Sequence, residues 1–148
     1  MSKDEEIGML TNQTNKIMLR YINSNLEKFG LTTEQWNVLK TLSKEETGIN
    51  QKKLSIKTDK DQPTIVRILD ILERKKFVER VPSKDDRRAF IINLTETGRN
   101  IIYTVEPFTE NLFKNLLDGI SEEKLNTYTE VLMSISKNIK NEISCRKN

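Results

Sequence analysis

Apolar residues recur every three or four positions over most of the chain, which is the spacing of amphipathic helices. The first such stretch predicts a long helix that ends at Gly30, because glycine adopts the left-handed backbone conformation at a helix end without a side-chain penalty. The predicted inner face of this helix consists of Ile7, Leu10, Thr14, Ile17, Tyr21, Leu26 and Phe29.

A second, shorter helix is predicted directly after Gly30. Residues 32–35 have the form T-x-x-Q, in which the threonine and glutamine side chains can satisfy each other's free backbone amides at a helix start. The following pattern turns Trp36, Leu39 and Leu42 inward. Residues 44–48, KEETG, then predict a polar loop.

Two further short helices follow, separated by a tight turn at residues 58–60. Asn50 is suited to cap the first and Asp61 the second, where Pro63 lies in the first turn and so removes an amide that would lack a partner. The predicted inward residues are Leu54 and Ile56 on the first helix, and Ile65, Ile68, Leu69 and Leu72 on the second. A short helix, a brief turn and another helix predict a helix-turn-helix.

Residues 75–95 change from helical spacing to strict alternation, which predicts a β-hairpin. In the first strand Phe77, Glu79 and Val81 alternate with Val78 and Arg80 up to Pro82; in the second, Phe90, Ile92 and Leu94 alternate with Ala89, Ile91 and Asn93. Two strands alone are barely stable, so their apolar side must lean on the preceding helices. A hairpin after a helix-turn-helix predicts a winged helix, with residues 83–88, SKDDRR, as its exposed loop.

The remainder of the chain predicts two more helices. Thr95 caps a helix with Ile101 or Ile102 inward, and Pro107 inside that helix predicts a bend or break. Further inward positions of this helix are Val105, Phe108, Leu112 and Leu116. Ser121, followed by two glutamates, opens the last helix, with Leu125, Tyr128, Leu132, Ile135 and Ile139 on one face. The expected fold is mainly α (α+β).

Composition excludes several classes of protein. The chain has 148 residues, 35% of them hydrophobic and 32% charged, and no stretch offers the roughly 18 uninterrupted apolar residues of a membrane span. The acidic start is unlike a signal peptide, so we expect a cytoplasmic protein without a membrane partner. No histidine and a single cysteine, Cys145, leave no ordinary zinc cluster, so no cofactor is expected. A magnesium or calcium site made of carboxylates alone is the alternative, although no EF-hand-like spacing occurs.

Basic residues are concentrated in the middle of the chain. Residues 50–92 hold 12 Lys and Arg against 7 Asp and Glu, whereas the net charge of the whole chain is only +3. A basic region that coincides with a winged helix favours a polyanion such as double-stranded DNA as partner, although a fluctuation of ordinary charged surface would give the same count.

The helix that begins after Asp61 is the candidate for the major groove of DNA, which admits one helix and is read by side chains near the N-terminus of that helix. Because the apolar residues occupy its inner face, the outward positions are Gln62, Pro63, Thr64, Arg67 and Arg74. Arg67 suits a guanine and Gln62 an adenine, while Thr64 suits a phosphate or a thymine methyl. The alternative for each of them is solvated surface.

The loop of the hairpin is the candidate for the minor groove, whose negative potential attracts arginine. Its basic residues are Lys84, Arg87 and Arg88. A neighbouring carboxylate, of Asp85 or Asp86, can hold an arginine guanidinium by a bidentate pair of hydrogen bonds and so orient it. A polar hairpin tip without a partner is the alternative.

In these same segments the sequence resembles the multiple antibiotic resistance regulator (MarR) family of bacterial transcription factors. The resemblance lies in LTTEQWNVLKTL, residues 31–42, and in residues 61–98, and most specifically in the pattern D-x-R-x-x-x-x-x-L-T at Asp86, Arg88, Leu94 and Thr95, followed by Gly98. It implies a homodimer of winged helices. The two-fold symmetry of such a dimer predicts a near-palindromic operator, and we expect the dimer to act as a repressor that a small ligand releases. The resemblance also implies that Arg88 is the minor-groove arginine, that Asp86 orients it, and that Gln62, Thr64 and Arg67 lie on the recognition helix.

Two positions depart from the pattern of the family. Lys76 stands where members often have glycine, so a non-glycine residue is expected in a left-handed conformation at a cost of about 1 kcal/mol. Asp70 lies on the outer half of the recognition helix, where it would repel a phosphate.

The expected organisation is one domain, residues 1–148. Residues 32–98 form the DNA-binding lobe, and residues 1–30 and 99–148 form a helical dimerisation region, because their apolar stripes are too long for a small lobe to cover. A compact monomer is the alternative. The resemblance further implies a cleft for a small aromatic ligand, which Tyr21, Phe29 and Trp36 could line, although aromatic residues at helical spacing are more often core.

Two other functions remain open at this stage. A winged helix can bind protein and sequester another regulator, and its binding would then not fall with salt as DNA binding does. An enzyme would have to use carboxylates such as Glu45 and Glu46 in an exposed loop, without a histidine or a glycine-rich phosphate loop. We therefore expect no catalytic residues.

Overall fold

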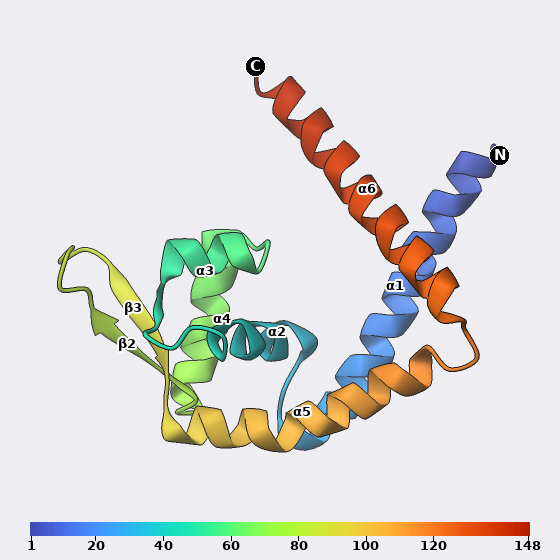
Figure 1. The fold of residues 1–148 in the computed structure, drawn as a ribbon. Coiled ribbons are helices and arrows are strands. Elements are labelled where there is room, and N and C mark those ends of the chain that lie inside the picture. Colours follow the sequence, from blue (N-terminus) through green and yellow to red (C-terminus); the bar gives the residue numbers. More distant parts are fainter. The chain divides into compact units, whose positions relative to one another are not determined.

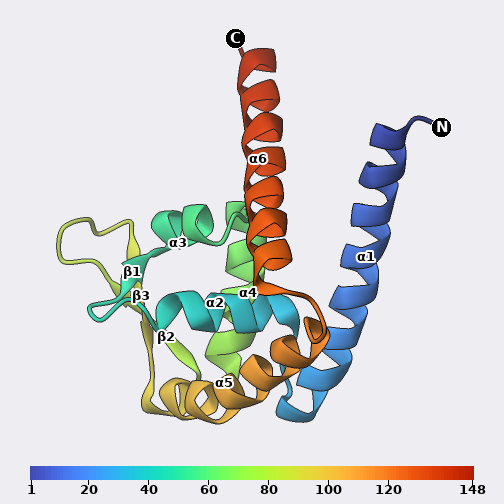
Figure 2. The ribbon, with the colours of Figure 1, turned by 45° about the vertical axis from the view of Figure 1, so that its right-hand side comes forward.

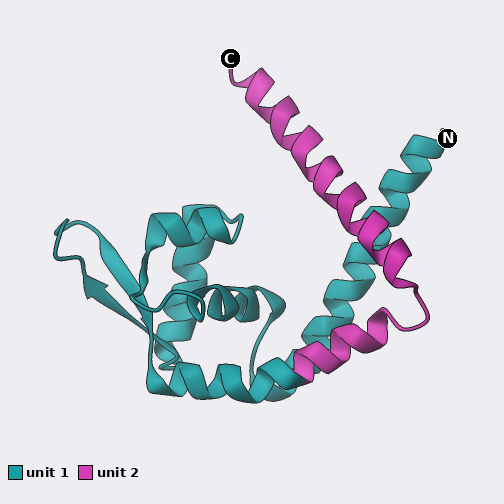
Figure 3. Cartoon of the chain, in the orientation of Figure 1, with its two compact units in different colours: residues 1–107 teal, residues 108–148 magenta.

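A computed structural model of the chain describes residues 1–148, which fall into two compact units, residues 1–107 and residues 108–148 (Figure 3). Figure 1 labels the main elements in chain order. These elements are α1 (Lys3–Leu26), η1 (Glu27–Phe29), α2 (Thr33–Leu42), β1 (Ile49–Asn50), α3 (Gln51–Lys57), α4 (Gln62–Arg74), β2 (Val78–Pro82), β3 (Phe90–Leu94), α5 (Glu96–Leu116) and α6 (Glu122–Arg146). The predicted winged helix-turn-helix fold, mainly α with a small sheet, is confirmed. None of the helices combines the length and the apolar character that crossing a membrane requires.

The first two helices begin and end at the predicted signals. Gly30 has φ 68°, and its left-handed conformation closes the helical segment that α1 and η1 form. Thr32 and Gln35 form the predicted capping box at the start of α2, in which the Thr32 hydroxyl accepts from the Gln35 amide and the Gln35 side chain accepts from the Thr32 amide. Local sequence therefore sets where η1 ends and α2 begins, and Lys75 adds a distant contact by donating to Gly30 O.

The helix-turn-helix consists of α3 and α4, and its two caps are those predicted. The Asn50 side chain accepts from the amide of Lys53, and the Asp61 side chain accepts from the amide of Thr64. Between the two helices Asp59 adopts a left-handed conformation, with φ 52°. The prediction that Ile56 points inward is wrong, because its side chain is 70% exposed.

The core of the first unit lies among α2, α3, α4 and the sheet. The four predicted inward residues of α4 are at most 1% exposed, and Leu54 of α3, Leu39 of α2 and Ile92 of β3 are fully buried. Four apolar residues therefore fix the face of α4 that contacts this core, and the opposite face lies outside the core.

The sheet has three strands in the order β1-β3-β2, all antiparallel. The two strands of the hairpin lie where the alternation predicted them, and Val78 pairs with Leu94 at one end and Pro82 with Phe90 at the other. The strand β1 was not predicted, because its two residues, which pair with Ile92 and Ile91, are too few to show alternation. Figure 2 shows the three strands beside α3 and α4, with the loop between β2 and β3 extending beyond them.

The end of α4 has the left-handed residue that the departure from glycine predicted. Lys76 has φ 62°; its amide donates to Glu73 O, and the amide of Phe77 donates to Leu72 O at 2.9 Å. This pair of hydrogen bonds is the Schellman motif that ends many helices. The hydrogen bonds of the motif hold Lys76 in a conformation that its side chain disfavours.

The helix α5 begins at the predicted cap. The Thr95 hydroxyl accepts from the amide of Gly98 and donates to Lys76 O, so the helix start is attached to the end of α4. Of the bend or break predicted at Pro107, the break is not found, since α5 continues through the proline to Leu116. The two compact units divide directly after it.

In the second unit α6 begins at the predicted cap, where the Ser121 hydroxyl accepts from the amide of Lys124 at 3.3 Å. No residue of α6 is buried, although its exposed apolar side chains recur at spacings of three and four residues. These side chains are Tyr128, Leu132, Ile135, Ile139 and Ile143. The helix therefore presents an uncovered apolar face.

Candidate nucleic-acid interface

The first turn of α4 presents polar groups to solvent. Gln62 and Pro63 are exposed and Thr64 is half-buried, because Ile65 and its apolar neighbours commit the other side of the helix to the core. The carboxylate of Asp61 accepts from the amide of Thr64 at 2.8 Å. Hydrogen bonds from the side chain and the backbone of Thr64 hold the pKa of Asp61 below its ordinary value of 3.8. This cap thus fixes the amides of the first turn and leaves Gln62 free to reach a base edge.

Arg67, the predicted guanine-reading residue, does not point freely into solvent. Its Nη2 lies 3.0 Å from Oε2 of Glu34 on α2, and the other oxygen of that carboxylate, Oε1, lies 3.9 Å from Nζ of Lys60. The arginine side chain is nevertheless 58% exposed. Glu34 could not be found from the sequence, because nothing in the spacing relates a residue of α2 to one 33 positions later.

Asp70 is not a free negative charge on the recognition helix. Its Oδ1 accepts from Nη2 of Arg80 at 2.6 Å, and Nε of the same arginine lies 3.8 Å from Glu73. Arg80 therefore offsets the two carboxylates of α4 and ties β2 to that helix. The expectation that Asp70 would repel a phosphate did not allow for this pairing. Arg74 lies exposed at the last turn of α4.

The loop of the hairpin is shaped by its own backbone. The amide of Ser83 donates to Ala89 O at 2.9 Å, and the amide of Ala89 donates to Asp86 O. Oδ1 of Asp86 accepts from the backbone amide of Arg88 at 2.9 Å. The expected pair between a loop carboxylate and an arginine guanidinium is not formed. Asp86 instead fixes the turn that carries Arg88, and the side chains of Lys84, Arg87 and Arg88 are exposed.

A groove of about 570 Å³ brings the helix-turn-helix and the hairpin loop together. It contains Gln62 of α4 together with Asp86 and Arg88 of the loop, two of the segments that the sequence singled out. Its other lining residues are Asn50, Gln51, Lys52, Lys53, Ile56, Ala89 and Phe90. Lys52 and Lys53 were missed as individual residues, although both belong to the basic stretch of residues 50–92; their position in the first turn of α3 was the available signal.

The three aromatic residues expected at a ligand cleft have different environments. Trp36 is 5% exposed and belongs to the core of the first unit, with Nζ of Lys40 5.8 Å from the centre of its ring. Tyr21 on α1 is 45% exposed, and Phe29 is half-buried near the end of the same helical segment. Trp36 therefore fits the alternative that these aromatic residues form core.

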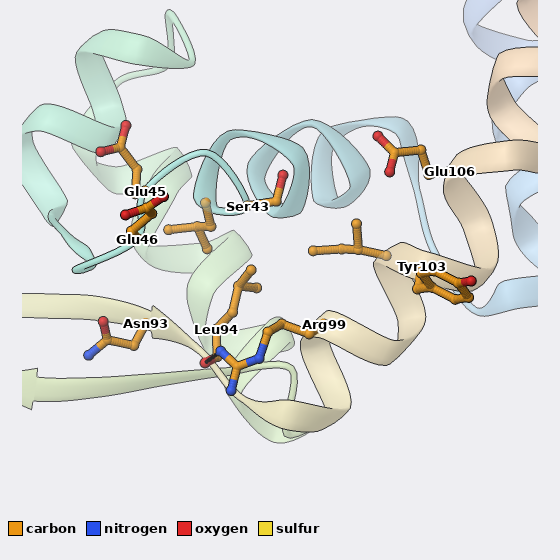
Figure 4. A pocket seen from close by; sticks show the side chains of 10 residues that line it. Ser43, Glu45, Glu46, Asn93, Leu94, Arg99, Tyr103 and Glu106 are labelled. Carbon is orange, nitrogen blue, oxygen red and sulfur yellow. Dashed lines mark hydrogen bonds between the residues drawn. The ribbon is translucent and has the colours of Figure 1, made fainter.

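A second hollow, of about 420 Å³, lies elsewhere in the first unit. Figure 4 shows Glu45 and Glu46 on one side of it and Tyr103 and Glu106 on the other, with Arg99 near Leu94. Arg99 donates to the carbonyl of Leu94 at 3.0 Å, and Tyr103 is 84% exposed. Leu42, Ser43, Asn93 and Ile102 also line this hollow, which we call the α5 hollow. Glu45 is paired with Lys57 of α3, and Glu106 with Lys40 of α2.

The chain is similar in sequence to known proteins. The sequence pattern of the MarR family matches residues 31–90. The HTH-type transcriptional regulator SarZ of Staphylococcus haemolyticus is 32% identical over 125 residues, which cover 84% of this chain and 84% of the relative.

Two solved structures extend the comparison to the fold. The structure of CouR from Rhodococcus jostii RHA1, bound to p-coumaroyl-CoA, has a TM-score of 0.79 and 26% sequence identity, and the match covers 91% of this chain and 94% of that one. The structure of the S. aureus MepR–DNA complex has a TM-score of 0.80 at 23% identity, covering 93% and 98%, and supports the likeness of fold alone.

Proposed function

Because the chain belongs to the MarR family of transcriptional regulators, we propose that it binds double-stranded DNA as a homodimeric repressor with a near-palindromic operator. Each subunit lays α4 in the major groove and inserts the hairpin loop into the adjacent minor groove. Gln62, Pro63, Thr64 and Arg67 contact the major groove, and Lys84, Arg87 and Arg88 enter or flank the minor groove. Arg74, at the end of α4, contacts the DNA backbone, and Asp86 positions Arg88 through its amide.

The groove shared by α4 and the hairpin loop is the observation that carries this proposal. It sets Gln62, a side chain suited to a base edge, in the same concave surface as Arg88, a side chain suited to the minor groove. Lys52 and Lys53 line the same groove and provide charge for phosphates. A surface built from base-reading, groove-entering and phosphate-binding groups suits duplex DNA better than a folded protein.

A second copy of the chain is the partner that fits the uncovered apolar faces. On α1, Ile7, Leu10, Ile17 and Tyr21 are between 45% and 61% exposed, and α6 presents its own apolar row. Burying about 1,000 Å² of such surface, at roughly 25 cal/mol per Å², stabilises a dimer by more than association costs in most estimates. These helices therefore support the assignment of residues 1–30 and 99–148 to dimerisation and of residues 32–98 to DNA binding.

The salt dependence of binding tests this function. We expect the logarithm of the association constant, measured by fluorescence anisotropy on duplex DNA, to fall linearly with the logarithm of salt concentration, with a slope of about −5 to −9. The reason is that a dimer using several cations per subunit releases a counterion for each phosphate that it neutralises. Binding that does not change between 50 and 200 mM salt, a range in which phosphate contacts weaken strongly, would favour a protein partner instead.

A small aromatic ligand is proposed to act at the α5 hollow. The volume of the hollow lies within the roughly 300–1,000 Å³ of ligand sites, and the ring of Tyr103 is available for stacking. Leu94 belongs to β3 of the wing, so a ligand there would act directly on the base of the hairpin.

A Tyr103→Ala variant tests this site. For an aromatic compound that raises the melting temperature of the wild type, we expect at least about a fivefold weaker affinity in the variant, because one stacking contact is lost. Tyr103→Phe, which keeps the aromatic ring, is the matched control and should leave the affinity unchanged. An equal loss in both variants, or in neither, would reject the α5 hollow as the ligand site.

A further inference from the structure

On the predicted DNA-reading face, one carboxylate contacts the arginine proposed to read a base. It is that of Glu34, which pairs with Arg67. It lies in the first turn of α2, whereas its two cationic neighbours, Arg67 and Lys60, belong to α4 and to the turn before α4. Nη2 of Arg67 is 3.0 Å from Oε2, and Nζ of Lys60 is 3.9 Å from Oε1. A single carboxylate therefore spans two cations that approach it from a different part of the fold.

This contact leaves most of the arginine free. A guanidinium has five N–H donors, and the geometry engages Nη2 alone, so the remaining donors can still form a fork with a base. The side chains of Arg67 and Glu34 are 58% and 48% exposed, and an ion pair this exposed contributes little to the stability of a fold. The pair of Asp70 with Arg80 differs, because the arginine there is only 20% exposed and joins a strand to a helix.

We infer that Glu34 is a specificity-determining residue, which restrains Arg67 for base recognition and weakens its attraction to phosphates. The inference rests on the proposed DNA-binding function. An unrestrained arginine binds any nearby phosphate, whatever the sequence. The carboxylate offsets the charge of Arg67 and holds its guanidinium from one side. Arg67 therefore adds less affinity for DNA of arbitrary sequence, while its guanidinium stays oriented for a hydrogen-bonded pair with the correct base.

Replacing Glu34 by glutamine tests this role while keeping the shape of the side chain. We expect Glu34→Gln to tighten binding to random-sequence DNA about fivefold per subunit at 150 mM salt. The released arginine can make one further phosphate contact, and one such contact changes the logarithm of the affinity by about 0.9 per tenfold change in salt. Binding to the selected operator should change less, so the ratio of specific to non-specific affinity should fall at least about threefold. The melting temperature should not change.

A double-mutant cycle with Arg67→Ala separates restraint from simple charge. If Glu34 acts through Arg67, Glu34→Gln should have little effect on the affinity ratio in the Arg67→Ala background. Glu96→Gln, which removes an exposed carboxylate from the first turn of α5, is the matched control and should leave both affinities unchanged.

Two results would overturn the inference. One is an unchanged affinity ratio in Glu34→Gln; the other is the same change in the presence and absence of Arg67, which would reduce Glu34 to a local charge. Both leave the proposed function intact as long as the wild type binds DNA with the expected salt dependence. A wild type that binds no DNA, or binds it independently of salt, refutes the proposed function itself.

Discussion

Replacing Arg88 by alanine is expected to weaken operator binding by about 2–6 kcal/mol, because a dimer inserts two wings and each arginine contributes about 1–3 kcal/mol. The structure gives Arg88 an exposed side chain on a turn that Asp86 fixes through the backbone amide. The alanine variant keeps this amide, so the loop should keep its shape and lose only the guanidinium. The measurement is the dissociation constant for the selected operator at fixed salt.

Two further variants make the Arg88 result specific. Arg88→Lys keeps the charge, but its ammonium is more strongly hydrated and lacks the planar fork, so we expect affinity between that of the wild type and that of alanine. Arg146→Ala removes one positive charge at the end of α6 and should change operator affinity only by the effect of the lower net charge. A fully active Arg88→Ala protein would mean that the hairpin loop stays outside the minor groove.

Gly98→Ala is expected to destabilise the fold by about 2–4 kcal/mol, although alanine normally favours a helix over glycine. A Cβ at this position would lie 2.0 Å from Phe77 O and 3.0 Å from Phe77 C. That backbone cannot move away easily, because Phe77 O also accepts from the amide of Thr95 at 3.1 Å. The clash therefore falls where the end of α4 meets the start of α5. Chemical denaturation at one protein concentration measures the loss.

Gly8→Ala is the matched control for this helix position. Gly8 lies inside α1, and a Cβ there would meet nothing within 4 Å. We expect the free energy of unfolding of this variant to rise by about 0.5–1 kcal/mol, because alanine loses less backbone entropy than glycine in a helix. If Gly98→Ala were stabilised to the same degree as Gly8→Ala, the close approach of Phe77 to α5 would be wrong.

The sequence predicted those parts of the fold that depend on neighbouring residues. Caps act over three positions, so Thr32, Asn50, Asp61 and Ser121 each started a helix where expected. The left-handed residues at helix ends were also predicted. Gly30 is left-handed, and Lys76, at a position where family members often have glycine, adopts the same conformation after α4.

Features that depend on distant residues could not be predicted in this way. The strand β1 exists because Ile49 and Asn50 pair with β3 more than 40 positions later, and two residues carry no pattern of their own. Ile56 was expected inside, but a helix of seven residues has too few turns to define its inner face.

The candidate site shows the same limit at single residues. Spacing showed that Arg67 and Asp70 point outward from α4, but not that Glu34 and Arg80 meet them there. In the hairpin loop, Asp86 was expected to orient Arg88 through its guanidinium, whereas the carboxylate accepts from the backbone amide. Composition indicates which side chains are available, and the partner of each one follows only from the tertiary structure.

The central claim is that two copies of this chain hold one duplex, each with α4 in the major groove and its hairpin loop in the minor groove. Selection of bound sequences from random DNA, followed by light scattering of the protein with the selected duplex, tests it most directly. The account predicts two chains on one duplex and two inverted half-sites about 10 base pairs apart, centre to centre. One chain per duplex, or selected DNA without inverted symmetry, would contradict it.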